Sequence, residues 1–311
     1  MTREETSRLG AVVLHHRNWP GIRATLDALL AQVSAACEVV VVDNASHDGS
    51  VDAIRSGYPD LHVIELAENR GYGPGMNAGI AALGDRDSFL LMTHDCVLGS
   101  TCLSTLADAL GTDLGLGIVG PLIAWRSRPD RVYSVGGVLA GRRMVTHHRG
   151  WEERVSDRRN TGLRQAQWLE GACLLIRSEV FSSVGPFDEH YFMYFEETEL
   201  CVRAARAGWR LACDTGAIAW QEPGQPSHSL WTRNRLRFVM RNFPARVVAF
   251  EIAGRLEEIA SRLVSRDPDD RRTARSMLRG LAAIPLRSDP ERLYGRGMQR
   301  DPRSSARTHT A

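Results

Sequence analysis

The sequence predicts an α/β fold in which a Rossmann-like, mostly parallel sheet is flanked by helices and followed by a C-terminal helical extension. Two observations support this prediction. Short apolar runs bounded by turn residues alternate with helical patterns, and one of them, Val39–Val42, contains only β-branched residues. Such a run is typical of a strand buried on both faces, as in parallel sheets. From Ser229 onward the pattern is instead almost continuously helical.

Four strands and four helices alternate in the first part of the chain. The expected strands are Leu9–His15, Cys37–Val42, Leu61–Leu66 and Ser88–Met92. The expected helices are Trp19 to about Gln32, Ser50–Ser56, the segment ending near Leu83, and Ser100–Leu110. The first of these helices carries one apolar stripe, which includes Ile22, Leu26 and Leu29. Because β-α-β crossovers are right-handed, this alternation indicates a mostly parallel sheet.

The character of the chain changes after Gly120. We expect short apolar pieces within Val132–Leu139, a mobile loop over the Arg/His-rich stretch Arg142–Arg159, and strands at Trp168–Ile176 and Leu211–Trp220. A helical turn is expected at Ser178–Val184. A longer helix should end at Gly208, with Glu199 and Arg203 paired one turn apart. Further helices are expected from Ser229 to about Ser265, interrupted at Pro244, and from Asp269 to about Ala283.

The composition and the sequence patterns indicate where in the cell the protein is expected. Its 311 residues include 43% hydrophobic and 24% charged residues, and all 39 basic residues are arginine. The six cysteines form no CxxC pair, the N-terminus has no signal-peptide pattern, and no apolar run approaches the roughly 18 residues of a membrane span. We therefore expect a cytoplasmic protein, with attachment to the inner face of the membrane as an alternative.

Two aspartates stand where strands are expected to end. Asp43 follows the run Val39–Val42, and Asp95 follows Ser88–Met92 after Thr93 and His94. Ligands of open α/β sheets bind beyond the carboxyl ends of the strands, so both side chains should face one site. A carboxylate tolerates a diphosphate when a divalent cation lies between them. The alternative is that Asp95 only caps the next helix.

A glycine-rich loop opens the third expected helix. Gly71, Gly73, Gly75 and Gly79 do not follow the G-x-G-x-x-G spacing of dinucleotide-binding loops. Glycines at a helix start nevertheless allow backbone N–H groups to approach an anion, and Arg70 adds a positive charge. A tight turn with a surface arginine is the alternative interpretation.

An acidic cluster interrupted by aromatic residues precedes the helix that ends at Gly208. It comprises Asp188, Glu189, Glu196, Glu197 and Glu199. Neighbouring carboxylates beside apolar walls raise one another's pKa, which suits a general base near neutral pH. An acidic helix start, favoured by the helix dipole alone, explains the same residues equally well.

Taken together, four ordered blocks resemble the inverting family-2 nucleotide-sugar glycosyltransferases of the GT-A fold, in particular their rhamnosyltransferase-like members. The blocks are VVVVDNASHDGSV, ENRGYGPGMNAGI, LLMTHDCVL and LEGACLLIRSEVFSSVGPFDEHYFMYFEETELCVRAARAGW. The resemblance as a whole extends from about Gly10 to Asn242, roughly three-quarters of the chain.

The resemblance implies a role for each block. Asp43, with His15 and His16 beside it, would hold the nucleobase, and Arg70 would lie near the base or the diphosphate. Asn44, Gly71 and Asn77 belong to the same nucleotide-sugar-binding blocks. Asp95 would contact a divalent cation, Mg²⁺ or Mn²⁺. His228 would complete that metal site if it reached it, and a solvated loop histidine is the alternative. Glu197 would be the general base, while Glu196 and Asp188 would shape the acceptor pocket, with Glu196 as the second choice for the base.

Three departures from the family pattern bear on these roles. Thr93 replaces the first acidic or amide residue of the D-x-D motif, and the E-D-x-D pattern reads E-E-T-E. Gln221 stands where the family often has histidine. These differences motivate an alternative function, a nucleotide-sugar-binding pseudoenzyme or regulatory module without transfer activity.

The implied organisation is a GT-A domain over residues 1–228, a helical extension over 229–285 and a disordered tail over 286–311. Within the first domain, residues 1–120 would bind the nucleotide and 121–228 the acceptor. Expected partners are a nucleotide-sugar donor, with dTDP-rhamnose or a UDP-sugar first, and a glycan, lipid-linked or small-molecule acceptor. The C-terminal helices offer a surface for homodimerisation, and their arginines offer contact with an anionic membrane, although a solvated helix face explains them too. No nucleic-acid partner is expected.

Overall fold

A computed structural model describes residues 8–33, 37–224 and 226–283. The chain divides into two compact units, Met1–Pro223 and Gly224–Ala311, and each unit is considered by itself. The expected disordered tail, 286–311, lies outside the described residues. The domain boundaries expected from the sequence stay a prediction.

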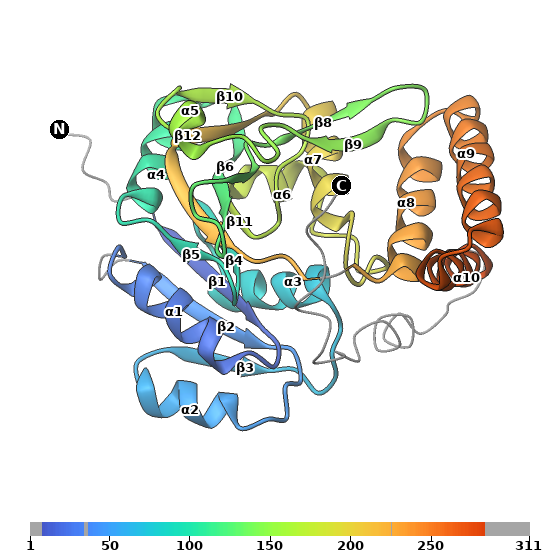
Figure 1. Ribbon diagram of the computed structural model, residues 1–311. Coiled ribbons are helices and arrows are strands. Elements are labelled where there is room, and N and C mark those ends of the chain that lie inside the picture. The colour runs from blue at the N-terminus through green and yellow to red at the C-terminus, as the bar shows by residue number, and fades with distance from the viewer. Residues whose placement is uncertain (1–7, 34–36, 225, 284–311) are drawn as a thin grey trace. The chain divides into compact units, whose positions relative to one another are not determined.

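The first unit is built around a sheet whose strands run in the order β10-β12-β6-β11-β4-β1-β2-β3 (Figure 1). In addition, β5 pairs with β12 and β7 pairs with β6. Its strands are β1 Leu9–His15, β2 Glu38–Asp43, β3 His62–Glu65, β4 Ser88–Thr93, β5 Val97–Leu98, β6 Leu116–Trp125, β7 Val132–Ser134, β10 Leu163–Gln165, β11 Cys173–Arg177 and β12 Arg210–Gln221. β4, β1, β2 and β3 are mutually parallel, as the sequence predicts. β11 is antiparallel to β4 and to β6, and β12 is parallel to β6.

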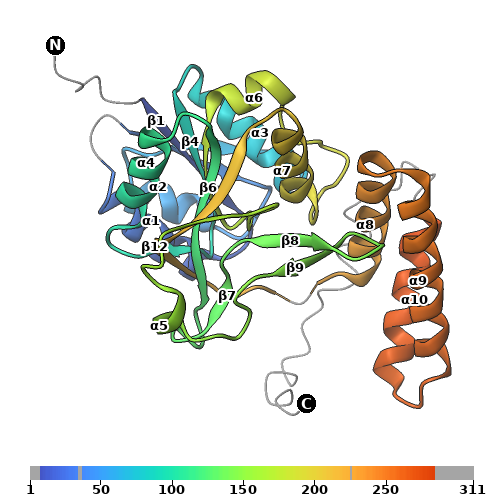
Figure 2. The same cartoon turned by 90° about the horizontal axis from the view of Figure 1, so that it is seen from above.

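Helices cover both faces of this sheet (Figure 2). They are α1 Trp19–Leu30, α2 Ser50–Gly57, α3 Tyr72–Leu83, α4 Cys102–Thr112, α5 Val155–Arg158, α6 Ser178–Val184 and α7 Glu196–Arg206. Alternate residues of β1 point to opposite faces: Val12 packs with Met76 of α3, whereas Val13 packs with Leu26 of α1 and Leu106 of α4. The predicted α/β architecture with a mostly parallel central sheet is therefore confirmed.

The part of the chain after α4 differs from expectation in three places. The ten-residue strand β6 was not predicted. β11 begins at Cys173, so the first half of the expected strand from Trp168 is irregular. The stretch Arg142–Arg159, predicted as a loop, contains α5 and the strand β9 Val145–His148. β9 pairs antiparallel with β8 Gly137–Ala140 in a separate two-stranded sheet, which satisfies backbone groups of both segments.

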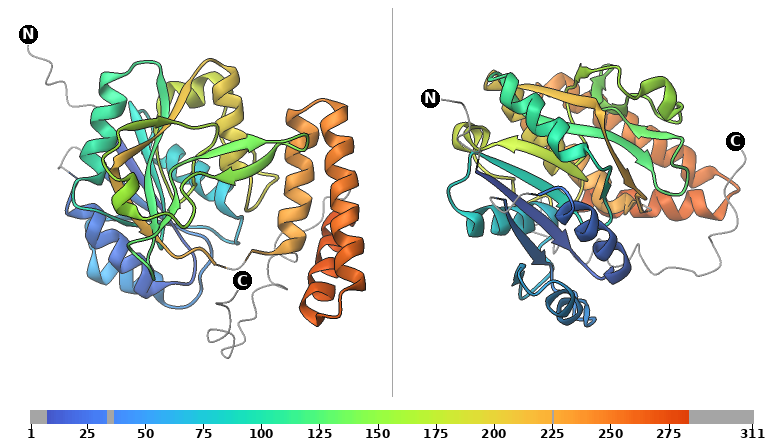
Figure 3. Two further views of the ribbon diagram at one scale, coloured as in Figure 1. Left: turned by 45° about the horizontal axis from the view of Figure 1, so that its top comes forward. Right: turned by 90° about the vertical axis from the view of Figure 1, so that its left-hand side faces the viewer.

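Three helices make up the described part of the second unit, and they pack side by side (orange to red in Figure 3). They are α8 His228–Asn242, α9 Ala245–Val264 and α10 Pro268–Ala282. Pro244 separates α8 from α9, as predicted, because proline cannot continue the hydrogen-bonded backbone of a helix. Asp267 caps α10 by accepting from the amide of Asp269 at 2.8 Å. Within the described residues, no helix has the length and apolarity needed to cross a bilayer.

Candidate active site

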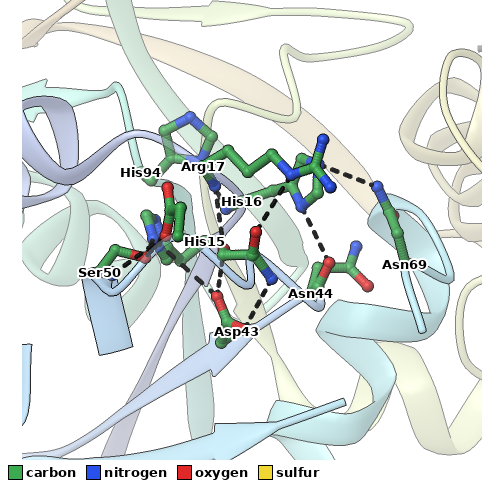
Figure 4. Close-up of polar contacts among 10 residues, drawn as sticks. His15, His16, Arg17, Asp43, Asn44, Ser50, Asn69 and His94 are labelled. Atoms are coloured by element: carbon green, nitrogen blue, oxygen red, sulfur yellow. Dashed lines mark hydrogen bonds and ion pairs between the residues drawn. The ribbon is translucent and has the colours of Figure 1, made fainter. Parts of the chain in front are cut away.

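The carboxyl ends of β1 and β2 bring His15 and Asp43 to the same level of the sheet (Figure 4). The Asp43 carboxylate accepts hydrogen bonds from the Ser46 amide at 3.0 Å and from the Ser46 hydroxyl. His15 Nε2 lies 2.7 Å from Ser50 Oγ and 3.9 Å from Asp43 Oδ1. Burial lowers the pKa of His15 to about 4, so the ring is neutral at physiological pH. The structure thus fixes both predicted residues at the strand ends.

His16 and Asn44 connect these strand ends to the loop before α3. Nδ1 of His16 lies 2.9 Å from the Asn44 carbonyl oxygen, and Nε2 lies 3.4 Å from the Asn69 amide nitrogen (Figure 4). The Asn44 side chain accepts from the Arg70 amide at 2.8 Å and donates to the Gly71 carbonyl at 2.9 Å. Because Asn44 uses its side chain in this way, it positions the loop; its contact with a donor stays a prediction.

The glycine-rich loop then docks against the segment that leads into α7. Gly71 has φ of +86°, and a Cβ atom there would lie 2.0 Å from the carbonyl oxygen of Phe192. The Tyr72 amide donates to that oxygen at 2.6 Å. Only glycine permits such an approach of two backbones. This contact brings the acidic cluster, far away in the sequence, to the ends of β1 and β2.

Arg70 and Asn77 make further contacts across this junction. The Arg70 guanidinium is partly exposed and pairs with Glu189 at 2.8 Å. The Asn77 side chain accepts from the Phe187 amide at 3.1 Å and donates to its carbonyl at 3.0 Å. Asn77 therefore holds the chain that precedes α7. The structure does not test the predicted donor contacts of Arg70, Gly71 and Asn77.

Asp95 lies beyond β4, where the end of β12 reaches it. The Gln221 side-chain amide donates to Asp95 Oδ1 at 3.2 Å and to Thr93 Oγ1 at 3.3 Å. The carboxylate, the hydroxyl and the amide therefore form one polar group. No group of three or more His, Cys, Asp or Glu side chains that would hold a metal ion occurs among residues 8–33, 37–224 and 226–283.

Glu197 lies at the same edge of the sheet as Asp95. The Thr93 amide donates to the Ala172 carbonyl at 3.1 Å, which fixes Gly171 and Ala172 beside the end of β4. A Cβ atom at Gly171 would lie 3.4 Å from Glu197 Cγ. Tyr72 holds the same turn, because its hydroxyl donates to the Gly171 carbonyl at 2.7 Å. The sheet thus brings Asp43, Asp95 and Glu197 to one end.

The first turn of α7 has unusual protonation properties. Burial, and then the nearby charge of Glu170, raise the pKa of Glu197 to about 7, while Thr198 donates to its carboxylate at 3.0 Å. Burial, and then the charge of Glu197, raise the pKa of Glu196 well above its usual value. Among the described residues, Glu196 Oε2 finds no hydrogen-bond partner. Glu197 is therefore suited to accept a proton near neutral pH, whereas Glu196 favours its protonated form.

The remaining predicted residues lie near this group or in the other unit. Asp188 Oδ1 accepts from the His190 amide at 3.0 Å and lies 2.7 Å from His190 Nδ1. Glu199 forms the predicted pair with Arg203 at 2.7 Å and is buried, so its role is structural. His228 begins α8 in the second unit, and its part in a metal site stays a prediction.

Two neighbours of this site were missed at the sequence level. Glu170 lies 3.0 Å from His148 Nδ1 and contributes to the raised pKa of Glu197. His94 packs edge-on against His15 with ring centroids 5.5 Å apart, and its Nδ1 accepts from the His16 amide at 3.3 Å. Glu170 was hidden within a predicted strand. His94 could have been recognised as a candidate site residue from the sequence, since it stands between Thr93 and Asp95 at a strand end.

The chain has relatives among characterised glycosyltransferases. The chain is 32% identical over 213 residues to N-acetylglucosaminyl-diphospho-decaprenol L-rhamnosyltransferase of Mycobacterium tuberculosis, covering 59% of this chain and 67% of that protein. It is 27% identical over 186 residues to a low-salt glycan biosynthesis hexosyltransferase of Haloferax volcanii, covering 57% of this chain and 56% of that protein.

Solved structures share the fold. GalNAc-T7 with UDP, GalNAc and Mn²⁺ superposes with a TM-score of 0.62 at 13% identity, covering 91% of this chain and 57% of that one. The mannosyltransferase PcManGT of Pyrobaculum calidifontis, with GDP-Man and Mn²⁺, gives 0.58 at 16% identity, covering 92% and 89%. Residues 8–240 match the profile of glycosyltransferase-like family 2. With its GT-A fold and its acids at the strand ends, the chain belongs to this family of glycosyltransferases.

Proposed function

We propose that the protein transfers a sugar from a nucleoside-diphosphate sugar to an acceptor hydroxyl, with inversion at the anomeric carbon. Glu197 takes the proton of the acceptor hydroxyl, whose oxygen forms a bond to the anomeric carbon. The bond from that carbon to the diphosphate breaks, and the nucleoside diphosphate leaves with the electron pair. Attack from the face opposite the leaving group produces the inversion.

The observation that carries this proposal is the position of Glu197, together with its raised pKa. Its carboxylate lies at the same sheet edge as Asp95, and its pKa is raised to about 7. A base with a pKa near the working pH is ionised enough to accept a proton and basic enough to hold it. General-base assistance of this kind contributes about 10²–10⁴-fold to a rate.

The donor would be held on the side of the site opposite Glu197. Asp43 and the neutral His15 would bind the nucleobase, and Arg70 would lie near the base or diphosphate. Asp95, with Thr93 and Gln221, offers the oxygen donors that suit a hard divalent cation, Mg²⁺ or Mn²⁺. Such a cation would neutralise charge on the leaving diphosphate. Asp95 and Gln221 would orient the diphosphate end of the donor.

Donor and acceptor are inferred from the relatives. The mycobacterial relative is named for L-rhamnosyl transfer to an N-acetylglucosaminyl-diphospho-decaprenol, so dTDP-rhamnose and a lipid-linked saccharide are our first choices. UDP-sugars come next, as do glycan and small-molecule acceptors. We further propose that the arginines of the second unit contact the membrane in which a lipid-linked acceptor lies. Homodimerisation through that unit is a separate proposal.

The test combines binding with transfer. A thermal-shift screen of nucleoside diphosphates and their sugars, with and without Mn²⁺, identifies the donor. Transfer is then measured by NMR, which also reports the anomeric configuration of the product. We expect Asp95→Ala and Glu197→Ala to retain the fold and lose at least about 10²-fold of the rate. Donor binding by the wild type without any transfer or hydrolysis would favour the regulatory alternative.

A further inference from the structure

Five aromatic side chains of the first unit form a continuous group beside the site. This aromatic cluster consists of Trp125, Tyr133, His148, Trp151 and Trp168. Ring centroids are 4.9 Å apart for Trp125 and Tyr133, 5.2 Å for Tyr133 and Trp151, and 4.8 Å for Tyr133 and His148. His148 continues to Trp168 at 4.9 Å. Contacts of this geometry make the cluster a preorganised aromatic surface.

Trp151 is the exposed end of the aromatic cluster. Its side chain is 48% exposed, whereas Trp168 at the other end is 4% exposed. Trp151 contacts Trp125 at 5.3 Å and His148 at 5.5 Å. One buried ring, Trp168, and three half-buried rings therefore support one indole that solvent reaches. An exposed tryptophan held in this way is typical of a binding surface, because tryptophan offers a large contact area at a low entropy cost.

The aromatic cluster reaches the carboxylates of the site. His148 Nδ1 lies 3.0 Å from Glu170 Oε1, and Glu170 directly precedes Gly171, which packs against Glu197. Burial, and then the nearby charges of Glu170 and Glu197, raise the pKa of the Tyr133 phenol. The surface thus runs from the solvent-exposed indole of Trp151 to the carboxylate of Glu197.

Polar groups border the aromatic surface. Arg128 lies over the Trp125 ring at 5.0 Å and forms two hydrogen bonds, of 2.7 and 2.8 Å, with Glu152, the neighbour of Trp151. A planar guanidinium stacked on one side and paired in two places fixes Trp125 and Glu152 together. Apolar faces with a few fixed carboxylates suit a neutral ring that has C–H bonds on one face and hydroxyl groups on its edge.

We propose that the aromatic cluster binds the pyranose ring of a saccharide acceptor, stacked on Trp151, with a ring hydroxyl directed toward Glu197. This proposal rests on the function proposed above and adds the residue that would hold the saccharide acceptor named there as a first choice. Trp151 acts as a specificity-determining residue that touches the acceptor alone. Donor binding belongs to the strand ends and does not involve it.

The test uses N-acetylglucosaminyl diphosphate octyl ester as the acceptor probe and dTDP-rhamnose as the donor. Equilibrium binding of the probe in the presence of dTDP and steady-state transfer are both measured for the wild type, Trp151→Ala and Trp151→Phe. We expect Trp151→Ala to weaken probe binding and raise the acceptor KM about tenfold or more, as truncation of an aromatic residue that carries binding energy typically does. Trp151→Phe should retain most of the affinity, and the donor KM should not change.

Leu114→Ala is the matched control, because Leu114 is 73% exposed in the same unit and lies outside the aromatic cluster. It should behave as the wild type. Unchanged probe binding in Trp151→Ala, or no probe binding by the wild type, would overturn the proposed subsite. Probe binding that depends on Trp151 without any product would instead overturn the transfer reaction and leave the subsite standing. The two proposals therefore fail separately.

Discussion

Two adjacent glutamates at the start of α7 differ in their environment. Glu196 is 3% exposed, while Glu197 keeps some solvent contact and accepts from Thr198. Burial raises the pKa of both side chains. Only Glu197 combines access with a pKa near neutrality, which supports the proposal that it, and not Glu196, is the general base.

The pKa of Glu197 predicts the pH dependence of transfer. A general base works when it is deprotonated, and the pKa of Glu197 is raised to about 7. We expect kcat/KM to increase with pH below about 7, up to tenfold per pH unit, and to level off above it. The measurement is the pH–rate profile from pH 5.5 to 9. A profile that stays flat down to pH 5.5 would contradict the assignment of the base.

Glu170 provides a sharper test because it changes that profile without removing the base. Its carboxylate contributes to the raised pKa of Glu197, after burial. Glu170→Gln removes the negative charge, so ionised Glu197 becomes more favourable and its pKa decreases. The acid limb should therefore move to lower pH, measured as above. Glu179→Gln, on the exposed start of α6, is the control and should leave the limb in place.

At this scale the sequence was informative where a strand ended in an acid. Asp43 and Asp95 were recognised because each follows a buried apolar run, and the structure places both at one sheet edge. Glu170 escaped notice because the run from Trp168 resembles one strand, although β11 begins only at Cys173. Trp151 was missed because its neighbours are arginines and glutamates, which indicate a loop.

Secondary-structure elements, like single residues, were partly predicted from the sequence and partly missed. β6 was missed because Gly115, Gly117, Gly120 and Pro121 are typical of turns. In the structure, a Cβ atom at Gly117 would lie 2.9 Å from Trp209 Cβ, so glycine serves close packing there. Pro121 lies beyond the residues paired with β11 and beside an irregularity in the pairing with β12, where a missing N–H is tolerated. Such tertiary reasons are invisible in sequence patterns.

Helix packing predicts opposite effects for one substitution at two glycines. Gly280 of α10 faces α8 so closely that a Cβ atom would lie 2.2 Å from the Ser229 carbonyl oxygen, whereas at Gly111 of α4 nothing lies within 4 Å. Gly111→Ala should stabilise the protein by about 0.5–1 kcal/mol, since alanine favours helix. Gly280→Ala should destabilise it by about 1–3 kcal/mol through overpacking.

Unfolding followed by circular dichroism measures both changes, and each glycine serves as the control for the other. Stabilisation by Gly280→Ala would show that α8 and α10 do not pack as closely as described. Destabilisation by Gly111→Ala would show that other atoms do lie within contact distance of Gly111 in α4.

At the scale of the whole molecule, the arginines expected to contact a membrane fall into two groups. Arg255 is buried, pairs with Glu251 at 2.9 Å and Glu258 at 2.7 Å, and lies over Trp231 at 4.8 Å. Arg262 pairs with Glu258 and with Asp270, and Arg271 donates to the Ser265 carbonyl at 2.6 Å. These side chains hold the helical unit together. Fewer arginines of the second unit are therefore left to contact an anionic partner.

The exposed group lies on one face of α10. Arg272, Arg275 and Arg279 are spaced i, i+3 and i+7, so they share a face, opposite the buried Ala274 and Met277. Arg272 pairs with Asp269 at 3.3 Å, but both side chains are largely exposed, so the pair contributes little. This basic stripe on a separate unit suits a protein whose proposed acceptor is anchored in a lipid surface.

The basic stripe predicts salt-sensitive binding to anionic vesicles. Each arginine near such a surface contributes about 1 kcal/mol, which is screened as ionic strength increases. We expect cosedimentation with phosphatidylglycerol vesicles at low salt, little with phosphatidylcholine, and at least a tenfold weaker association after Arg272→Glu, Arg275→Glu and Arg279→Glu together. Transfer to a water-soluble acceptor should not change, because the stripe lies outside the catalytic unit. Equal sedimentation of wild type and triple variant would mean that α10 does not carry the contact, and its arginines would then be a solvated face.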